Sequence, residues 1–385
     1  MKSDRIPSLD GLRALSIGAV VVAHATGMAS FQLPAPVAPL VFHLGQLGVR
    51  VFFVISGYLI TSILFRELRK TGTLNVKKFY LRRTLRLMPG LYVLIGTVAL
   101  LGWMGWLRLD DGDLLGAATY TMNFHHPHAW WLAHCWSLGV EEQFYLLWPA
   151  LLLAVGRRGG LWICAVFVLV GPIIRTWSWY HGGQGIGESF QTVGDAVASG
   201  CLLAGLRPWL HERPLYRRLL DSRASWLVAL GTAVSYFGFA KFFHAELTIG
   251  PTCLDLGIAL CIDYCLRHPA GKVGRVLNSA PMVAVGVGSY SIYLWQQMFL
   301  NRNGEWSVHS FPAALVAVAV ASTLSYFLVE RPFMRLRETL ERAWAARGRS
   351  QLEPRAEDVA QREREVGGLV PRQVELAQLR ENREL

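Results

Sequence analysis

Long runs of apolar residues, separated by Gly, Pro or charged residues, recur along the chain up to about residue 330. A helix that crosses a bilayer needs about 20 mainly apolar residues, and most of these runs approach that length. The pattern predicts an all-α polytopic membrane protein with about ten transmembrane helices. We expect these helices at about 11–30, 47–65, 87–107, 138–155, 161–177, 194–206, 226–242, 251–266, 280–300 and 312–330.

Basic residues alternate between the connections of these helices. Lys and Arg are concentrated in segments 66–86, 207–218 and 267–275. The alternate segments 31–46, 177–193 and 243–250 contain neither residue. Because Lys and Arg mark the loops on the cytoplasmic side of a membrane, we expect both termini in the cytoplasm.

Composition agrees with a chain whose main partner is the lipid bilayer. Charged residues make up 17% of the chain, against about a quarter in soluble proteins. The net charge of +11 is spread over short segments rather than pooled in one domain, so we expect no nucleic-acid partner. Residues 336–385 are dense in Arg and Glu and predict a charged cytoplasmic tail, helical or disordered.

The first apolar run contains two ionisable residues, Arg13 and His24. Eleven residues make about three helical turns, so the two side chains share one face and lie roughly 16 Å apart along the axis. Ionisable groups inside a membrane are costly and indicate a functional site. A histidine that is hydrogen-bonded by a neighbouring helix is the structural alternative.

Two further clusters stand at the ends of apolar runs. Arg83 and Arg86 are three residues apart, so they project together, and Arg pairs well with phosphate oxygens. An anchor for lipid headgroups is the alternative for this pair. Glu141 and Glu142 point about 100° apart on a helix, so they do not both face one partner.

Several segments together resemble the acyltransferase 3 family. They are "SLDGLRALSIGAVVVAHA", "FFVISGYLIT" (52–61), "RRTLRLMPG" (82–90), "CWSLGVEEQFYLLWP", and "SYSIYLW" (289–295) followed by "VERPF" (329–333). The resemblance covers about residues 5–335, in the order of the family. It implies a transmembrane acyltransferase domain over 1–335 in a bacterial cytoplasmic (inner) membrane.

The resemblance also implies a reaction, the transfer of an acyl group, by default acetyl, from cytosolic acyl-CoA to a hydroxyl. The acceptor would be a sugar, a glycan or a glycosylated metabolite. Acyl-CoA would be a co-substrate, and we expect no other cofactor and no metal. Which acceptor is used, and the acyl length, stay open.

The family's residues carry over by motif. Arg13 and His24 match its Arg-x10-His pair, and Arg83 and Arg86 match an Arg-x-x-Arg pair associated with the donor. We expect His24 to be the general base, because an imidazole of ordinary pKa suits that task near neutral pH.

Glu141 or Glu142 would orient His24, as carboxylates often do for catalytic imidazoles. Supporting positions are His134, Ser137 and Tyr58. A covalent acyl-enzyme on His24, Ser137 or Cys135 is the alternative to direct transfer. Many family members carry His after "YLW", whereas this chain carries Gln296.

Other polar residues predict structure rather than chemistry. Clustered histidines such as the "HHPH" segment (125–128) can bind a metal, but no Cys or carboxylate follows at a familiar spacing, so we interpret the segment as a surface loop. Asp255 and Asp263 either mark a water-filled path or pair with neighbouring arginines such as Arg175, and pairing with Arg175 is the structural interpretation of Asp195. Two other classes of function stay open, a proton-coupled membrane transporter and a membrane scaffold that acts through the tail.

Overall fold

The computed structural model describes residues 5–28, 30, 31, 33, 34, 37–222, 225–239, 248–301 and 307–350. The chain forms two units, Met1–Glu330 and Arg331–Leu385. The second unit contains α14, Arg331–Ser350, so the first part of the expected tail is helical, and 351–385 lie outside the described residues.

Helices form the first unit, and its described residues contain no strand. The α-helices are α1 (Pro7–Ala25), α2 (Ala38–Thr71), α3 (Val76–Trp103), α4 (Asp113–Ala118), α5 (Trp130–Ala133), α6 (Cys135–Tyr180), α7 (Phe190–Glu212), α8 (Pro214–Asp221), α9 (Ser225–Phe239), α10 (Gly250–Arg267), α11 (Lys272–Leu277), α12 (Ala280–Phe299) and α13 (Ala313–Ser325). Three short turns are η1 (Met122–Phe124), η2 (Ser307–His309) and the π-helical η3 (Tyr326–Glu330).

Five helical segments in the described part are long and apolar enough to cross a membrane. They are Pro7–Ala25, Ala38–Thr71, Val76–Trp103, Trp130–Tyr180 and Ala313–Trp344. The prediction of an all-α membrane protein is therefore confirmed. The described part of each expected range overlaps a helix, and the expected helix at 194–206 is the longer α7, Phe190–Glu212. Helices α1 and α3 end at Ala25 and Trp103, before the expected ends at 30 and 107, and residues 240–242 of the expected helix 226–242 lie outside the described residues.

The helices expected at 138–155 and 161–177 follow one another inside α6 without a loop. Gly156 alone separates them, with φ of 68° and ψ of −178°, which is not a helical conformation. Only glycine adopts such a positive φ without steric cost, so one residue makes the kink.

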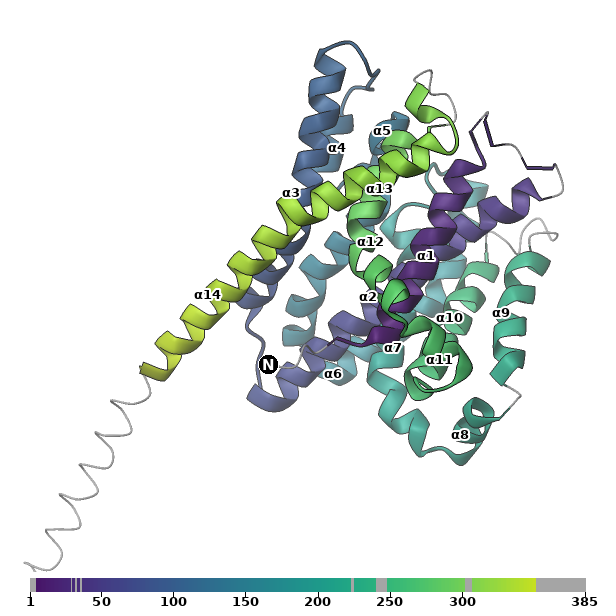
Figure 1. The fold of residues 1–385 in the computed structure, drawn as a ribbon. Helices are drawn as coiled ribbons and strands as arrows, with labels where there is room; N and C mark the ends of the chain where they lie inside the picture. Colours follow the sequence, from purple (N-terminus) through teal and green to yellow (C-terminus); the bar gives the residue numbers. More distant parts are fainter. Residues whose placement is uncertain are drawn as a thin grey trace, which may run out of the picture. The chain divides into compact units, whose positions relative to one another are not determined.

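Helix α7 packs against α2, α6 and α10, and α1 packs against α2 and α12 (Figure 1). At the crossing of α2 and α7 the backbones meet at two glycines. A Cβ on Gly57 would meet the carbonyl oxygen of Val197, and a Cβ on Gly200 would meet that of Val54. Small residues that let backbones approach are typical of helix pairs in membranes.

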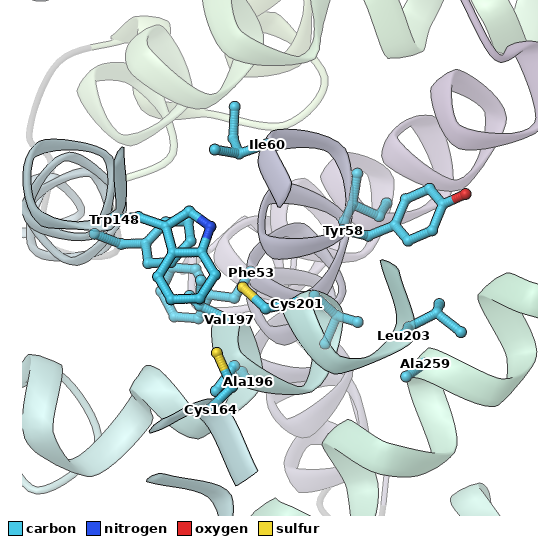
Figure 2. Close-up of a cluster of buried hydrophobic side chains, with 14 of the residues drawn as sticks. Phe53, Tyr58, Ile60, Trp148, Cys164, Ala196, Val197, Cys201, Leu203 and Ala259 are labelled. Atoms are coloured by element: carbon cyan, nitrogen blue, oxygen red, sulfur yellow. The ribbon is translucent and has the colours of Figure 1, made fainter. Parts of the chain in front are cut away.

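Large apolar side chains fill the space beside this crossing. Figure 2 shows Trp148 of α6 directed at a group that includes Phe53 of α2 and Cys201 of α7. The indole nitrogen of Trp148 donates a hydrogen bond of 2.9 Å to Thr61 Oγ1, so the polar atom of this buried ring is satisfied.

Arginine pairs with each of the three aspartates for which this was expected, Asp195, Asp255 and Asp263. Arg175 Nη1 lies 2.8 Å from Asp195 Oδ2, and Arg50 Nη1 lies 2.8 Å from Asp255 Oδ2. Asp263 is bound by Arg207. Buried charges are tolerated when they are paired, so these residues hold helices together.

Candidate active site

A cavity of about 650 Å³, part of it open to its surroundings, lies between α1, α2, α3, α6 and α12. Three arginines and one carboxylate line it, Arg13, Arg83, Arg86 and Glu141. These four were predicted as site residues from three separate apolar runs. The packing brings them around one space that carries a net positive charge.

The arginines reach the cavity from two helices. Arg13 comes from α1, with Nη1 3.6 Å from Asp10 Oδ1 one turn before it. Arg83 and Arg86 come from the first part of α3, whose N-cap is Asn75, and the side chain of Asn75 accepts from Lys78 N. Their spacing of three residues puts both on one side of α3.

Arg83 is held by an aromatic ring. Its guanidinium carbon lies 4.1 Å from the centroid of the Tyr145 ring, which also lines the cavity. A cation over a ring face is attracted by the ring quadrupole. The N–H groups lie in the guanidinium plane and not on its face. The contact with the ring therefore holds Arg83 in place, and the N–H groups can still donate hydrogen bonds to an anion.

Glu141 and Glu142 have different surroundings, as their angle on the helix requires. Glu141 Oε1 accepts a hydrogen bond of 2.6 Å from Ser56 Oγ of α2, and both residues line the cavity. Glu142 is not among the lining residues in the described part of the chain. Of the two carboxylates, Glu141 is therefore the one at the cavity.

His24 lies one residue before the end of α1, half-buried, and is not among the residues that line this cavity in the described structure. Its Nδ1 is 2.7 Å from Gln296 Oε1. In the tautomer that donates from Nδ1 to this amide oxygen, the lone pair of the neutral ring is on Nε2. The Trp130 ring meets the imidazole edge-on, with centroids 5.5 Å apart.

His134 and Ser137 join α6 to α12. The buried His134 Nε2 donates to the Leu294 carbonyl oxygen at 3.1 Å. The Tyr293 hydroxyl donates to the His134 carbonyl oxygen at 3.0 Å and lies 2.6 Å from Ser137 Oγ. Ser137 and Tyr293 line the cavity.

Tyr58, expected as a supporting residue, has a different position. It belongs to the buried cluster of Figure 2, where its ring points away from Trp148. It is not among the cavity-lining residues that the structure describes. Its contacts are those of a packing residue.

Four residues at or near the site were not assigned by the sequence. Gln296 was noted only as a departure from the family, and Ser56, Tyr145 and Glu330 were inside quoted motifs without a role. Glu330 is buried, and its Oε1 accepts from Ser291 Oγ at 2.5 Å and from Ser325 Oγ at 3.2 Å. A polar residue inside an apolar run was the available signal for Gln296 and Ser56.

The fold and the site together define a helical integral membrane protein with an arginine-lined cavity between its helices. The acyltransferase domain family of the acyltransferase 3 type has a family model that matches residues 6–331. The chain therefore belongs to this family, as the motifs predicted.

Curated relatives are similar over most of this chain. The peptidoglycan O-acetyltransferase OatA of Listeria monocytogenes is 26% identical over 362 residues, which cover 85% of this chain and 55% of that protein. "Putative O-acetyltransferase SACOL0978" of Staphylococcus aureus is 27% identical over 369 residues, 85% of this chain and 57% of that protein. The chain thus spans about half the length of the curated relatives that it matches. No solved structure matches it.

Proposed function

We propose that this protein is a membrane O-acyltransferase that moves an acetyl group from cytosolic acetyl-CoA to a hydroxyl of a sugar or glycan. The observation that carries the proposal is the arrangement along α1. Arg13 stands in a cavity with Arg83, Arg86 and Glu141, and His24 stands near the other end of the same helix.

The arginine-lined end suits the donor. Coenzyme A carries several phosphate charges, and Arg binds phosphate through charge-assisted, often bidentate hydrogen bonds. The basic loop before α3 would face the cytoplasm by the distribution of Lys and Arg. The same distribution supports ten crossings with both termini inside, a membrane domain over 1–335 and a cytoplasmic tail over 336–385.

His24 is the general base in this proposal. Its Nε2 takes the proton of the acceptor hydroxyl while the oxygen attacks the thioester carbonyl carbon. The carbon–sulfur bond breaks, an ester forms, and the coenzyme A thiolate takes the proton back from His24. General base catalysis of this kind contributes about 10²–10⁴-fold to the rate.

Gln296 is the residue that orients His24. We expected a carboxylate from Glu141 or Glu142 in this role, but the 2.7 Å contact supports the amide of Gln296 instead. An acceptor at Nδ1 fixes the tautomer that has its lone pair on Nε2, which is the function of the third group in catalytic triads. Glu141 and Ser56 would then position the arginines and the donor.

A glycan acceptor is supported by the relatives, since two of them are named as peptidoglycan O-acetyltransferases, one of them as putative. His24 lies toward the end of α1 away from the amino terminus, so the acceptor would enter from outside a bacterial cytoplasmic membrane. No cofactor besides the acetyl-CoA co-substrate takes part in the proposed reaction.

The test is acetyl transfer by the purified full chain in lipid vesicles. Radiolabelled acetyl-CoA is supplied with peptidoglycan fragments, and His24→Ala is compared with His181→Ala, which changes an exposed histidine. We expect wild type and His181→Ala to transfer acetyl groups and His24→Ala to be about 10²–10⁴-fold slower. Equal rates for wild type and a correctly folded His24→Ala would overturn the role of His24. Proton movement without acetyl transfer would favour a transporter.

A further inference from the structure

Two loops that are about 60 positions apart in sequence bring three metal-binding side chains together. His126 and His128 lie between η1 and α5, and Glu188 lies between α6 and α7. Glu188 Oε2 is 3.4 Å from His128 Nε2 and 3.9 Å from His126 Nε2. All three ligand atoms lie within 4.8 Å of one another.

We propose that His126, His128 and Glu188 bind a divalent first-row transition metal ion. Zn²⁺ is the ion that fits these three ligands best. Zn²⁺ holds His nitrogen and carboxylate oxygen at about 2.0–2.2 Å in a tetrahedron, so two ligand atoms are about 3.3 Å apart. Of the two distances to Glu188, 3.4 Å is close to this separation and 3.9 Å is somewhat longer. Three protein ligands leave one position for water or another small ligand.

Of the two histidines, His126 has the ring nitrogen that lacks a hydrogen-bond partner in the described part of the chain. Its Nε2 is buried and has no hydrogen-bond partner among the described residues, because 3.9 Å to Glu188 exceeds hydrogen-bond length. A buried nitrogen without a partner is costly, and a metal ion would satisfy it. Two imidazoles and a carboxylate are a donor set that suits Zn²⁺ and its neighbours.

A carboxylate from α4 holds the backbone around these histidines in place without an ion. Asp113 is fully buried, and its Oδ1 accepts from His125 Nε2 at 3.1 Å. Its Oδ2 accepts from the backbone N–H of Ala129 at 3.2 Å. The carboxylate therefore fixes the residues on both sides of His126 and His128, whose ring centroids are 5.2 Å apart.

Metal binding at this place has a consequence for the rest of the molecule. Trp130 follows His128 by two residues, and its indole N–H donates to the Gln297 carbonyl oxygen at 2.9 Å. The ring of Trp130 contacts that of His24. The ion would join the loop of Glu188 to the segment that carries Trp130, and so act as a structural clamp beside His24.

The experiment measures metal binding directly and does not need enzyme activity. The full chain is purified in detergent through a tag that contains no histidine, stripped with a chelator and titrated with Zn²⁺. Bound metal is counted by mass spectrometry, and Co²⁺ is substituted to read the geometry from its visible absorption. We expect about one ion per chain with a tetrahedral Co²⁺ spectrum.

Variants separate this site from unspecific binding. His126→Ala, His128→Ala and Glu188→Gln should each weaken Zn²⁺ binding by at least the about 10–100-fold that is typical of losing an outer partner of a metal site. His181→Ala should leave the affinity and the Co²⁺ spectrum unchanged. Zn²⁺ should raise the melting temperature of wild type but not of the conservative Glu188→Gln, whose metal-free melting temperature reports its folding.

Two results would overturn the proposal. One is Zn²⁺ binding of equal strength in wild type and in all three ligand variants, which would mean adventitious binding elsewhere. The other is the absence of bound Zn²⁺ from a folded wild type at concentrations that saturate ordinary zinc proteins. Activity in the metal-free protein would not affect either reading.

Discussion

Replacing Gln296 by Leu removes the hydrogen-bond partner of His24 Nδ1 that orients the imidazole in the proposed mechanism. Gln296 is fully buried on α12, and its Oε1 is 2.7 Å from His24 Nδ1. Leu has a similar volume and no acceptor. The substitution therefore leaves the packing nearly unchanged but removes the preference for the tautomer with its lone pair on Nε2.

The size of the effect follows from the strength of this hydrogen bond. A neutral hydrogen bond contributes about 0.5–1.5 kcal/mol net, and each 1.4 kcal/mol is tenfold in rate. If the whole contribution is used to orient His24 in the transition state, Gln296→Leu should lower kcat about 2–12-fold. Removing the imidazole in His24→Ala should cost more, about 10²–10⁴-fold.

The assay is single-turnover transfer from radiolabelled acetyl-CoA in lipid vesicles, with Gln296→His as the matched control. His also offers an acceptor nitrogen, so Gln296→His should retain more activity than Gln296→Leu. A rate for Gln296→Leu equal to that of wild type would refute the orienting role. A fall as deep as that of His24→Ala in a well-folded Gln296→Leu protein would refute it as well, because one neutral hydrogen bond is too weak for that loss.

Three further predictions concern the donor end, the helix crossing and an exposed ion pair. Arg86→Gln should raise KM for acetyl-CoA about 10–100-fold, because a hydrogen bond to a charged group contributes about 1.5–3 kcal/mol. Steady-state kinetics measures this KM, and an unchanged value would contradict the prediction. Gly57→Ala should lower the free energy of unfolding by about 1–3 kcal/mol through overpacking. Gly18→Ala is the control, because there is open space around Gly18. Equal melting temperatures of the two variants in detergent would contradict this prediction. Hydrogen bonds from Arg267 lower the pKa of Asp221, so this pair stabilises above the ordinary Asp pKa and its contribution is lost as pH falls through the lowered value. Asp221→Asn should thus lower the free energy of unfolding at pH 7 by less than about 1 kcal/mol, because the pair is exposed. The melting temperature should fall slightly at pH 7, and its difference from wild type should close in acid; a difference that grows in acid would contradict the prediction.

Much of the helical structure could be predicted because membrane helices depend on simple runs of apolar residues. Each expected range overlaps a helix among the described residues. The connection at Gly156 could not be predicted, because it is made by one glycine with positive φ and leaves no loop-like composition. Helix α8 is amphipathic and rich in Arg rather than continuously apolar, so a search for apolar runs does not find it.

The site could be predicted as a set of residues but not as an arrangement. Arg13 and Arg83 are 70 positions apart, and only the packing of α1 and α3 puts both at one cavity. The angle between neighbouring helical residues separated Glu141 from Glu142, but the choice between them depends on Ser56 of α2. The partner of His24 was sought among carboxylates, whereas the structure offers the amide of Gln296.

The third proposed metal ligand, Glu188, follows α6, whereas the histidine segment 125–128 precedes it. This is why the sequence spacing alone indicated an ordinary loop. About 21 residues precede Gly156 in this helix and about 24 follow it, which at 1.5 Å per residue makes roughly 31 and 36 Å. Each part is long enough for a hydrocarbon core of about 30 Å. If the chain turns back at Gly156, as two crossings require, the segments before and after α6 return to the same side of the membrane. The contact of His128 with Glu188 across these segments supports that path, and it supplies the ligand that no short sequence spacing could reveal.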